Sequence, residues 1–206
     1  AAKTAGLGYE CVISIPVDDK LKLETKLLEK EIQAVIASGH DLLMVVGTAG
    51  TTGAGTIDDL VRICEISKMY NIWFHVDAAY GGCAILSTKL KKKIKGIELS
   101  NSITFDAHKW MSIPMGASIF LTSNPLILTH TCSISTESMP KDADGLEIVD
   151  PFSHSIQWSR RFVGLKVYLS LLFYGWDGYD QVISNQSVMG DLLRQKLINN
   201  GWSIMN

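Results

Sequence analysis

The chain has 206 residues, with 47% hydrophobic and 19% charged residues and a net charge of −2, a balance typical of a globular protein. So small a net charge gives no support for a nucleic-acid partner, and no apolar run reaches the roughly 18 residues that a transmembrane helix needs. The four cysteines lie far apart without a CxxC pair, which excludes a zinc knuckle and favours free thiols in the reducing cytoplasm.

The first half of the chain predicts alternating strands and helices. Apolar runs predict strands over residues 10–15, 42–46 and 72–76, and apolar residues at helical spacing predict helices over 24–38 and 57–70. The run at 42–46 is unbroken, as expected for a strand covered on both faces of a sheet. A strand, a helix and a strand in this order predict a right-handed βαβ unit.

The second half predicts strands over 103–105 and 117–122, and helices over 159–174 and 179–199. Residues 123–150 are polar and irregular and predict a long loop. The five lysines within 89–95 indicate a solvated helix face rather than a docking patch. Residues 1–8 are typical of a helix end closed by glycine, so we expect the chain to be the middle portion of a larger protein.

Polar residues follow three of the predicted strands. Lys109 follows the strand that ends at Phe105, Asp77 follows the strand 72–76, and a glycine- and threonine-rich stretch, 47–53, follows the strand 42–46. Because open α/β sheets bind ligands at the carboxyl ends of their strands, we expect these groups at one rim. A lysine is costly to hold at such a place, which favours a chemical role for Lys109.

This set of groups suits pyridoxal phosphate. The amine of Lys109 would form the Schiff base, and the carboxylate of Asp77 would keep the pyridine nitrogen protonated so that the ring draws electrons from Cα. Backbone donors on glycine-rich turns and the neighbouring His108 suit a phosphate.

Two stretches, His75-Val76-Asp77-Ala78-Ala79-Tyr80 and His108-Lys109-Trp110, carry a family resemblance. Together with the turn Gly50-Thr51-Thr52, and with matching spacing, they resemble the group II pyridoxal-phosphate-dependent amino-acid decarboxylases, which include the aromatic-amino-acid, histidine and glutamate decarboxylases. The resemblance covers nearly the whole chain.

The resemblance implies an α/β fold with a mostly parallel sheet between helices, as in the aspartate aminotransferase-like (type I) fold. Residues 1–206 would form a single partial large domain, with the start of the cofactor domain and the small C-terminal domain outside the sequence. It implies a homodimer, or association with the remaining polypeptide, and a small-molecule substrate that is an amino acid. It also implies a cytoplasmic location and no metal. It assigns catalysis to Lys109, and cofactor binding to Thr52, Asp77, Ala79, Asp106, His108 and Lys109.

Some assignments stay open. Thr48 and Thr51 compete with Thr52 as turn residues, and Thr52 is preferred on spacing. Asp106 stands where some relatives carry Asn at the phosphate; a carboxylate repels phosphate, so we expect Asp106 to bond backbone amides or a neighbouring hydroxyl. Arg160 and Arg161 open a predicted helix and need an anionic partner there.

The function expected is decarboxylation of an L-amino acid, in an enzyme that needs the missing segments or a partner chain. The alternatives are another reaction of the same cofactor, namely aldehyde formation or transamination, and a non-catalytic subunit. No tyrosine lies between Tyr80 and Tyr168, and Ser138 stands near the place where many family members carry a protonating tyrosine. A metal site of His75, Asp77 and His108 is a rival that leaves Lys109 unexplained.

Overall fold

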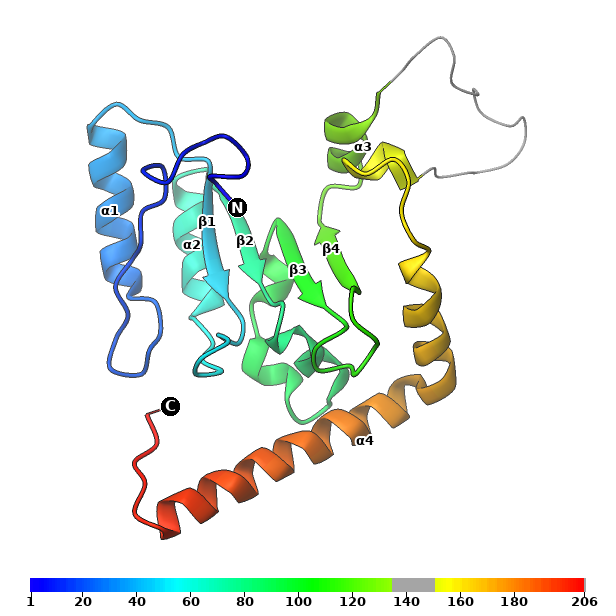
Figure 1. Ribbon diagram of the computed structural model, residues 1–206. Helices are drawn as coiled ribbons and strands as arrows, with labels where there is room; N and C mark the ends of the chain where they lie inside the picture. Colours follow the sequence, from blue (N-terminus) through cyan, green and yellow to red (C-terminus); the bar gives the residue numbers. More distant parts are fainter. Residues whose placement is uncertain (135–150, 206) are drawn as a thin grey trace, which may run out of the picture.

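A computed structural model describes residues 1–134 and 151–205 (Figure 1). Within them the strands form a four-stranded sheet in the order β1-β2-β3-β4. The first three strands are parallel and the fourth is antiparallel to the third. This confirms the predicted α/β class with a mostly parallel sheet. The bounds of the strands are β1 Met44–Thr48, β2 Trp73–Asp77, β3 Ser102–Asp106 and β4 Ser118–Thr122.

One face of the sheet carries the core. Val45 of β1 and Phe74 and Val76 of β2 are buried there, and they belong to one apolar cluster with Leu60 and Ile63 of helix α2, Leu60–Met69. Successive side chains of a strand point to opposite faces, so every second residue of β1 and β2 packs against this helix. The burial of these aliphatic and aromatic side chains is the main force that holds the sheet to α2.

The other face is polar and open among the described residues. Met44 and Val46 of β1 are each 44% exposed there, and Phe120 of β4 is 48% exposed. The expectation that the predicted strand 42–46 is covered on both faces of the sheet is therefore wrong for the part of the chain described. Apart from Trp73, the remaining side chains of this face are polar, namely Thr48, His75, Asp77, Ser102, Thr104, Asp106, Ser118 and Thr122. Of these, Thr48, Asp77 and Asp106 end the three parallel strands.

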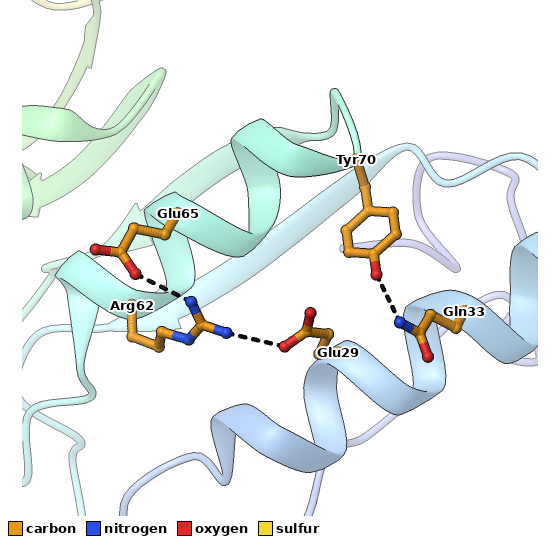
Figure 2. A network of polar contacts seen from close by, with 5 residues as sticks. All are labelled: Glu29, Gln33, Arg62, Glu65 and Tyr70. Atoms are coloured by element: carbon orange, nitrogen blue, oxygen red, sulfur yellow. Dashed lines mark hydrogen bonds and ion pairs between the residues drawn. The ribbon is translucent and has the colours of Figure 1, made fainter.

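Helix α1, Thr25–Ala37, lies on the outer side of α2 (Figure 1). Its residues Leu28 and Ile32 are buried in the common core. Figure 2 shows the polar contacts between the two helices. Arg62 of α2 pairs with Glu29 of α1 at 2.9 Å and, within α2, with Glu65 at 3.0 Å. Gln33 Nε2 of α1 donates to the hydroxyl of Tyr70, the C-cap residue of α2, at 2.7 Å. Such exposed contacts set the orientation of α1 more than its stability.

Asp58 fixes the connection between β1 and α2. Its Oδ2 accepts from the amide of Thr48, the last residue of β1, and its Oδ1 accepts from the amide of Leu23, each at 2.8 Å. The next residue, Asp59, is the N-cap of α2 and accepts from the amide of Arg62. The helix therefore starts three residues later than predicted, because Asp58 bonds outside the helix.

Two sequence-based expectations for the irregular parts are wrong. Residues 10–15 form no strand, because their backbone pairs with no neighbouring strand, and the nearest β contact is the isolated bridge of Val17 with Leu23. Within the predicted loop 123–150, Ile127–Cys132 forms helix α3, and residues 135–150 lie outside the described part. Residues 10–15 show that apolar character alone does not make a strand, because a strand also needs a neighbour to which its backbone can hydrogen-bond.

Helix α4, Val163–Asn199, joins the two helices predicted at the C-terminal end. Gly175 interrupts it with a φ of 61°, at the residue where the first was expected to stop (Figure 1). Arg160 and Arg161 precede its first turn, so the expectation that they open the helix is wrong. Arg160 donates to the carbonyl of Pro151 in the short 3-10 helix η4, Pro151–His154.

Three further 3-10 helices lie between β2 and β3, over Gly81–Leu86 (η1), Lys91–Ile94 (η2) and Ile97–Leu99 (η3). The lysines of 89–95 are exposed, as predicted, although on 3-10 turns and not on an α-helix. The second half of α4 packs on η1, where Tyr179 and Ile183 are buried. No helix in the described ranges is both long and apolar enough to cross a membrane.

Replacing Asp58 by Ala is expected to lower the free energy of unfolding by about 2–3 kcal/mol, because two amides lose a charged acceptor. Asp59→Ala is the matched control, since it removes one N-cap bond and should cost about 1 kcal/mol. Urea unfolding of both variants measures the difference. Equal losses would show that Asp58 does not hold the connection between β1 and α2.

Candidate active site

Three loops follow the carboxyl ends of β1, β2 and β3. The first, residues 49–56, is a tight turn in which the amides of Gly50 and Thr51 both donate to the carbonyl of Thr56 at 3.0 Å. The hydroxyls of Thr51 and Thr56 lie 2.9 Å apart. Thr52 is exposed in this turn, whereas Thr51 serves the turn itself. The preference for Thr52 over Thr51 as a cofactor residue stays a prediction.

The second loop begins with Asp77, the last residue of β2. Asp77 is exposed, and its Oδ1 accepts from the amide of Ala79 at 3.0 Å, which fixes the carboxylate at the rim. The loop is attached to both neighbours. The amide of Gly81 donates to the carbonyl of Ala49 at 3.0 Å, and the amide of Asp106 donates to the carbonyl of Ala79 at 3.3 Å.

The first and second loops touch through glycines. A Cβ on Gly81 would overlap the carbonyl oxygen of Ala49, so the backbones approach more closely than a side chain allows. Gly50 faces Gly81 and has a φ of 93°, a left-handed conformation that favours glycine. The glycines thus place the threonine turn directly beside the loop of Asp77.

The third loop carries Lys109 and Asp106 in direct contact. The Lys109 Nζ lies 3.0 Å from Asp106 Oδ2, and the hydroxyl of Ser118 donates to Asp106 Oδ1 at 2.6 Å. The bond that we expected between Asp106 and a neighbouring hydroxyl is therefore present. Burial raises the pKa of Asp106, but the hydrogen bond from Ser118 and the charge of Lys109 outweigh it and hold the pKa below its usual value. Asp106 is thus an anion that holds the amine, and a weak base.

His108 has a defined tautomer. Its Nδ1 accepts from the amide of Ala117 at 3.2 Å, so in the neutral ring the proton sits on Nε2. Nε2 lies 3.9 Å from Asp106 Oδ2. His108 therefore presents an N–H donor beside the amine of Lys109.

Outer contacts fix the third loop. The rings of Trp110 and Tyr80 stack with centroids 5.8 Å apart and join it to the second loop. Lys166 of α4 donates to the carbonyls of Pro114 and Met115 at 2.7 and 2.8 Å. The structure thus brings Asp106, His108 and Lys109 into one cluster and ties the loop of Asp77 and Ala79 to it.

The rival metal site is not formed. Both nitrogens of His75 contact hydroxyls, those of Ser102 and Thr104. In the described part of the chain, no three histidine, cysteine or acidic side chains come together as metal ligands. Cys83 is no alternative nucleophile, because burial raises the pKa of its thiol to about 12.

Three hydroxyls that surround these residues were not predicted from the sequence, namely those of Ser102, Thr104 and Ser118. Ser102, Thr104 and Asp106 alternate along β3, and this period of two could have placed them on the face of Asp77. Ser118 opposes Asp106 in the antiparallel register of β3 and β4. No local signal reveals that register, because residues 107–117 separate the two strands.

The family described as "Pyridoxal-dependent decarboxylase conserved domain" matches residues 1–203. The chain belongs to this family. One relative is the L-aspartate decarboxylase of Metarhizium robertsii, to which this chain is 34% identical over 185 residues. These residues are 90% of this chain and 37% of that protein. The phenylacetaldehyde synthase of Petunia hybrida is 34% identical over 178 residues, 85% of this chain and 35% of that protein.

A solved structure, mouse CSAD in its apo form, has the same fold as this family member. It superposes with a TM-score of 0.89 at 26% identity, over 96% of this chain and 41% of that one. The chain therefore spans little more than a third of the length of the two curated relatives. Ser138, near the expected place of the family's loop tyrosine, lies outside the described residues.

The groups at the rim fit pyridoxal phosphate by their chemistry. The amine of Lys109 suits an aldehyde, the exposed carboxylate of Asp77 suits a protonated ring nitrogen, and Nε2–H of His108 and the hydroxyl of Thr52 suit phosphate oxygens. The two carboxylates of the rim have different partners. Asp106 is paired with Lys109, whereas Asp77 accepts from the amide of Ala79.

Gly81→Ala is expected to lower the free energy of unfolding by about 1–3 kcal/mol, because the new methyl group overlaps the backbone of Ala49 and separates two loops. Gly53→Ala is the control in the same region, since a Cβ there meets nothing within 4 Å. Thermal unfolding compares the two. If Gly81→Ala were as stable as Gly53→Ala, the close approach of the loops would not matter.

Proposed function

We propose that this protein is a pyridoxal-phosphate-dependent decarboxylase of an L-amino acid. The observation that carries the proposal is the placement of Lys109 and Asp77 on adjoining loops at the carboxyl ends of adjacent parallel strands. When bound, pyridoxal phosphate supplies the electron sink for the bond that breaks at the substrate Cα. The residues of this chain hold, orient and charge that site.

Lys109 is proposed to attach the cofactor through its amine. Before attachment, Asp106 holds the amine at 3.0 Å, and Ser118 in turn holds Asp106. The depressed pKa of Asp106, which the Ser118 bond and the Lys109 charge bring about against burial, keeps this carboxylate anionic near neutral pH. Asp106 thus positions the lysine electrostatically, which is the role we propose for it in place of a phosphate contact.

Asp77 is proposed to pair with the ring nitrogen. Its Oδ1 is fixed by the amide of Ala79, and the short side chain of Ala79 leaves room for a ring face. A carboxylate fixed in advance stabilises charge without reorganising during the reaction. His108 and Thr52 are proposed as donors to the phosphate, His108 through Nε2–H.

We also propose that the active protein assembles as a homodimer, or with further polypeptide, in the cytoplasm. Large apolar side chains on the first half of α4 support association, with Tyr168 61%, Leu172 68% and Phe173 82% exposed. Covering so much apolar surface stabilises an assembly. The unpaired cysteines Cys64 and Cys83, both buried, agree with a reducing compartment.

Aldehyde formation is a second candidate reaction. The sequence has no tyrosine between Tyr80 and Tyr168. The chain is also 34% identical to the phenylacetaldehyde synthase of Petunia hybrida, although it is equally similar to an L-aspartate decarboxylase. Without a phenol to return a proton to Cα, dioxygen can oxidise the decarboxylated substrate by two electrons and is reduced to hydrogen peroxide. Water then hydrolyses the oxidised product to the aldehyde and ammonia.

The longest reading frame that contains this chain is expected to bind pyridoxal phosphate and to be labelled on Lys109 by borohydride. Peptide mapping after reduction identifies the labelled lysine. Lys109→Ala should lose the label and the visible absorbance of the bound cofactor while keeping its fold, because Lys109 is at the rim and not in the core. A label on the exposed lysines within 89–95 would contradict the proposal.

Product analysis under air and under nitrogen separates the two reactions. A decarboxylase should release amine at the same rate in both gases, with no peroxide. An aldehyde-forming enzyme should consume dioxygen and release aldehyde and peroxide under air only. Because the protonating tyrosine is absent from the sequence between Tyr80 and Tyr168, we expect either slow release of amine or measurable aldehyde under air. Fast, purely amine-forming turnover in both gases would contradict this.

A further inference from the structure

His75 occupies the middle of the open sheet face and is held on three sides. Its Nδ1 lies 2.8 Å from the hydroxyl of Ser102, and its Nε2 lies 3.1 Å from the hydroxyl of Thr104. The ring stacks on Phe120 of β4, with centroids 6.2 Å apart and planes inclined by 16°. Neither the cofactor site nor the apolar core accounts for a histidine with both nitrogens engaged.

The neighbours of Ser102 determine where the histidine proton sits. Trp73 Nε1 donates to the hydroxyl oxygen of Ser102 at 2.8 Å, and an indole nitrogen can only donate. Ser102 is only 3% exposed, so its own hydroxyl proton needs an acceptor. Nδ1 of His75 is the acceptor in contact, and it must therefore be unprotonated. The ring is then neutral, with its proton on Nε2, and donates to Thr104.

The surroundings of His75 contain one carboxylate that would favour a charged ring. Asp77 follows two residues later on the same face of β2, and it raises the pKa of His75. A hydrogen bond with the backbone of Ser102 also raises the pKa of His75, but burial has the largest effect and lowers that pKa below its usual value. The neighbours from the other strands, Val46, Thr104 and Phe120, are uncharged, and Asp106 farther along β3 is paired with Lys109.

We propose that His75 is a positioning residue for Asp77: the series Trp73, Ser102, His75 and Thr104 fixes a neutral imidazole, so that no cation on β2 competes for the carboxylate. The proposal rests on the proposed function, in which Asp77 pairs with the ring nitrogen of pyridoxal phosphate. An imidazolium at His75 would attract the carboxylate and weaken that pairing. The hydroxyl proton of Thr104 is left for an acceptor, and its partner in the strand register is Asp77.

The tautomer is measured directly by NMR of the complete protein with 15N-labelled histidine, in which His75→Gln assigns the signal. We expect His75 to be neutral from pH 8 to pH 6, with an unprotonated Nδ1. In Ser102→Ala this donor is lost, and the pKa of His75 should rise by about one unit. Ser102→Thr keeps the hydroxyl and should restore the wild-type signal.

Thr122→Ala is the matched control, since it removes a hydroxyl from the same face that donates to the carbonyl of Asn101 and not to His75. It should leave the His75 signal unchanged. A protonated Nδ1, or a charged ring at pH 7 in the wild type, would overturn the proposal.

Cofactor affinity tests the link to Asp77. On lowering the pH from 8 to 6, the dissociation constant of pyridoxal phosphate should rise about tenfold more in Ser102→Ala than in wild type or Thr122→Ala. The dissociation constant should rise because a protonated His75 pairs with Asp77 and competes with the ring nitrogen of the cofactor for that carboxylate. If the NMR signal of Ser102→Ala changed as expected but this difference were absent, the role toward Asp77 would be wrong. A wild type that bound no pyridoxal phosphate would instead refute the proposed function, whatever the tautomer.

Discussion

Parallel pairing of β2 with β1 and β3 is the constraint on which the site depends. The register places Thr48, Asp77 and Thr104 side by side at the carboxyl ends of the three strands. Because aligned residues of a sheet point to the same face, one choice of register puts all three polar groups at the rim, and a slip of one residue would bury Asp77 against α2. Phe74 and Val76 prevent that slip, because they must face the core.

Much of this arrangement could be predicted from the sequence, because its signals are local. Apolar runs located β1, β2 and β3 to within two residues, and the stretches around Asp77 and Lys109 carried the family resemblance. The structure puts Asp77 and Lys109 on adjoining loops, as the strand-end argument predicted. The roles assigned toward a cofactor stay predictions for all six residues, namely Thr52, Asp77, Ala79, Asp106, His108 and Lys109.

What the sequence could not supply depends on contacts between distant residues. The run 10–15 is as apolar as a strand, but it has no strand beside it. Asp58 falls within the predicted helix 57–70, whereas its oxygens bond the amides of Leu23 and Thr48 outside helix α2. Ser118 reaches Asp106 only through the register of β3 and β4. In each case the residue that decides the local structure lies far away in the sequence, and periodicity gives no information about such distant contacts.

The polar groups of the open face satisfy one another in two separate sets, and this separation has a chemical consequence. Ser118 and Lys109 neutralise Asp106, while Trp73, Ser102 and Thr104 hold His75 without any charge. Asp77 lies between the sets, and among the described residues its side chain is bonded to the amide of Ala79 alone. A carboxylate pairs best with the cation of a ligand when no nearer cation competes for it. With Lys109 paired to Asp106, and with His75 neutral as we propose, Asp77 is the carboxylate of this face that remains for a cationic ligand at the rim.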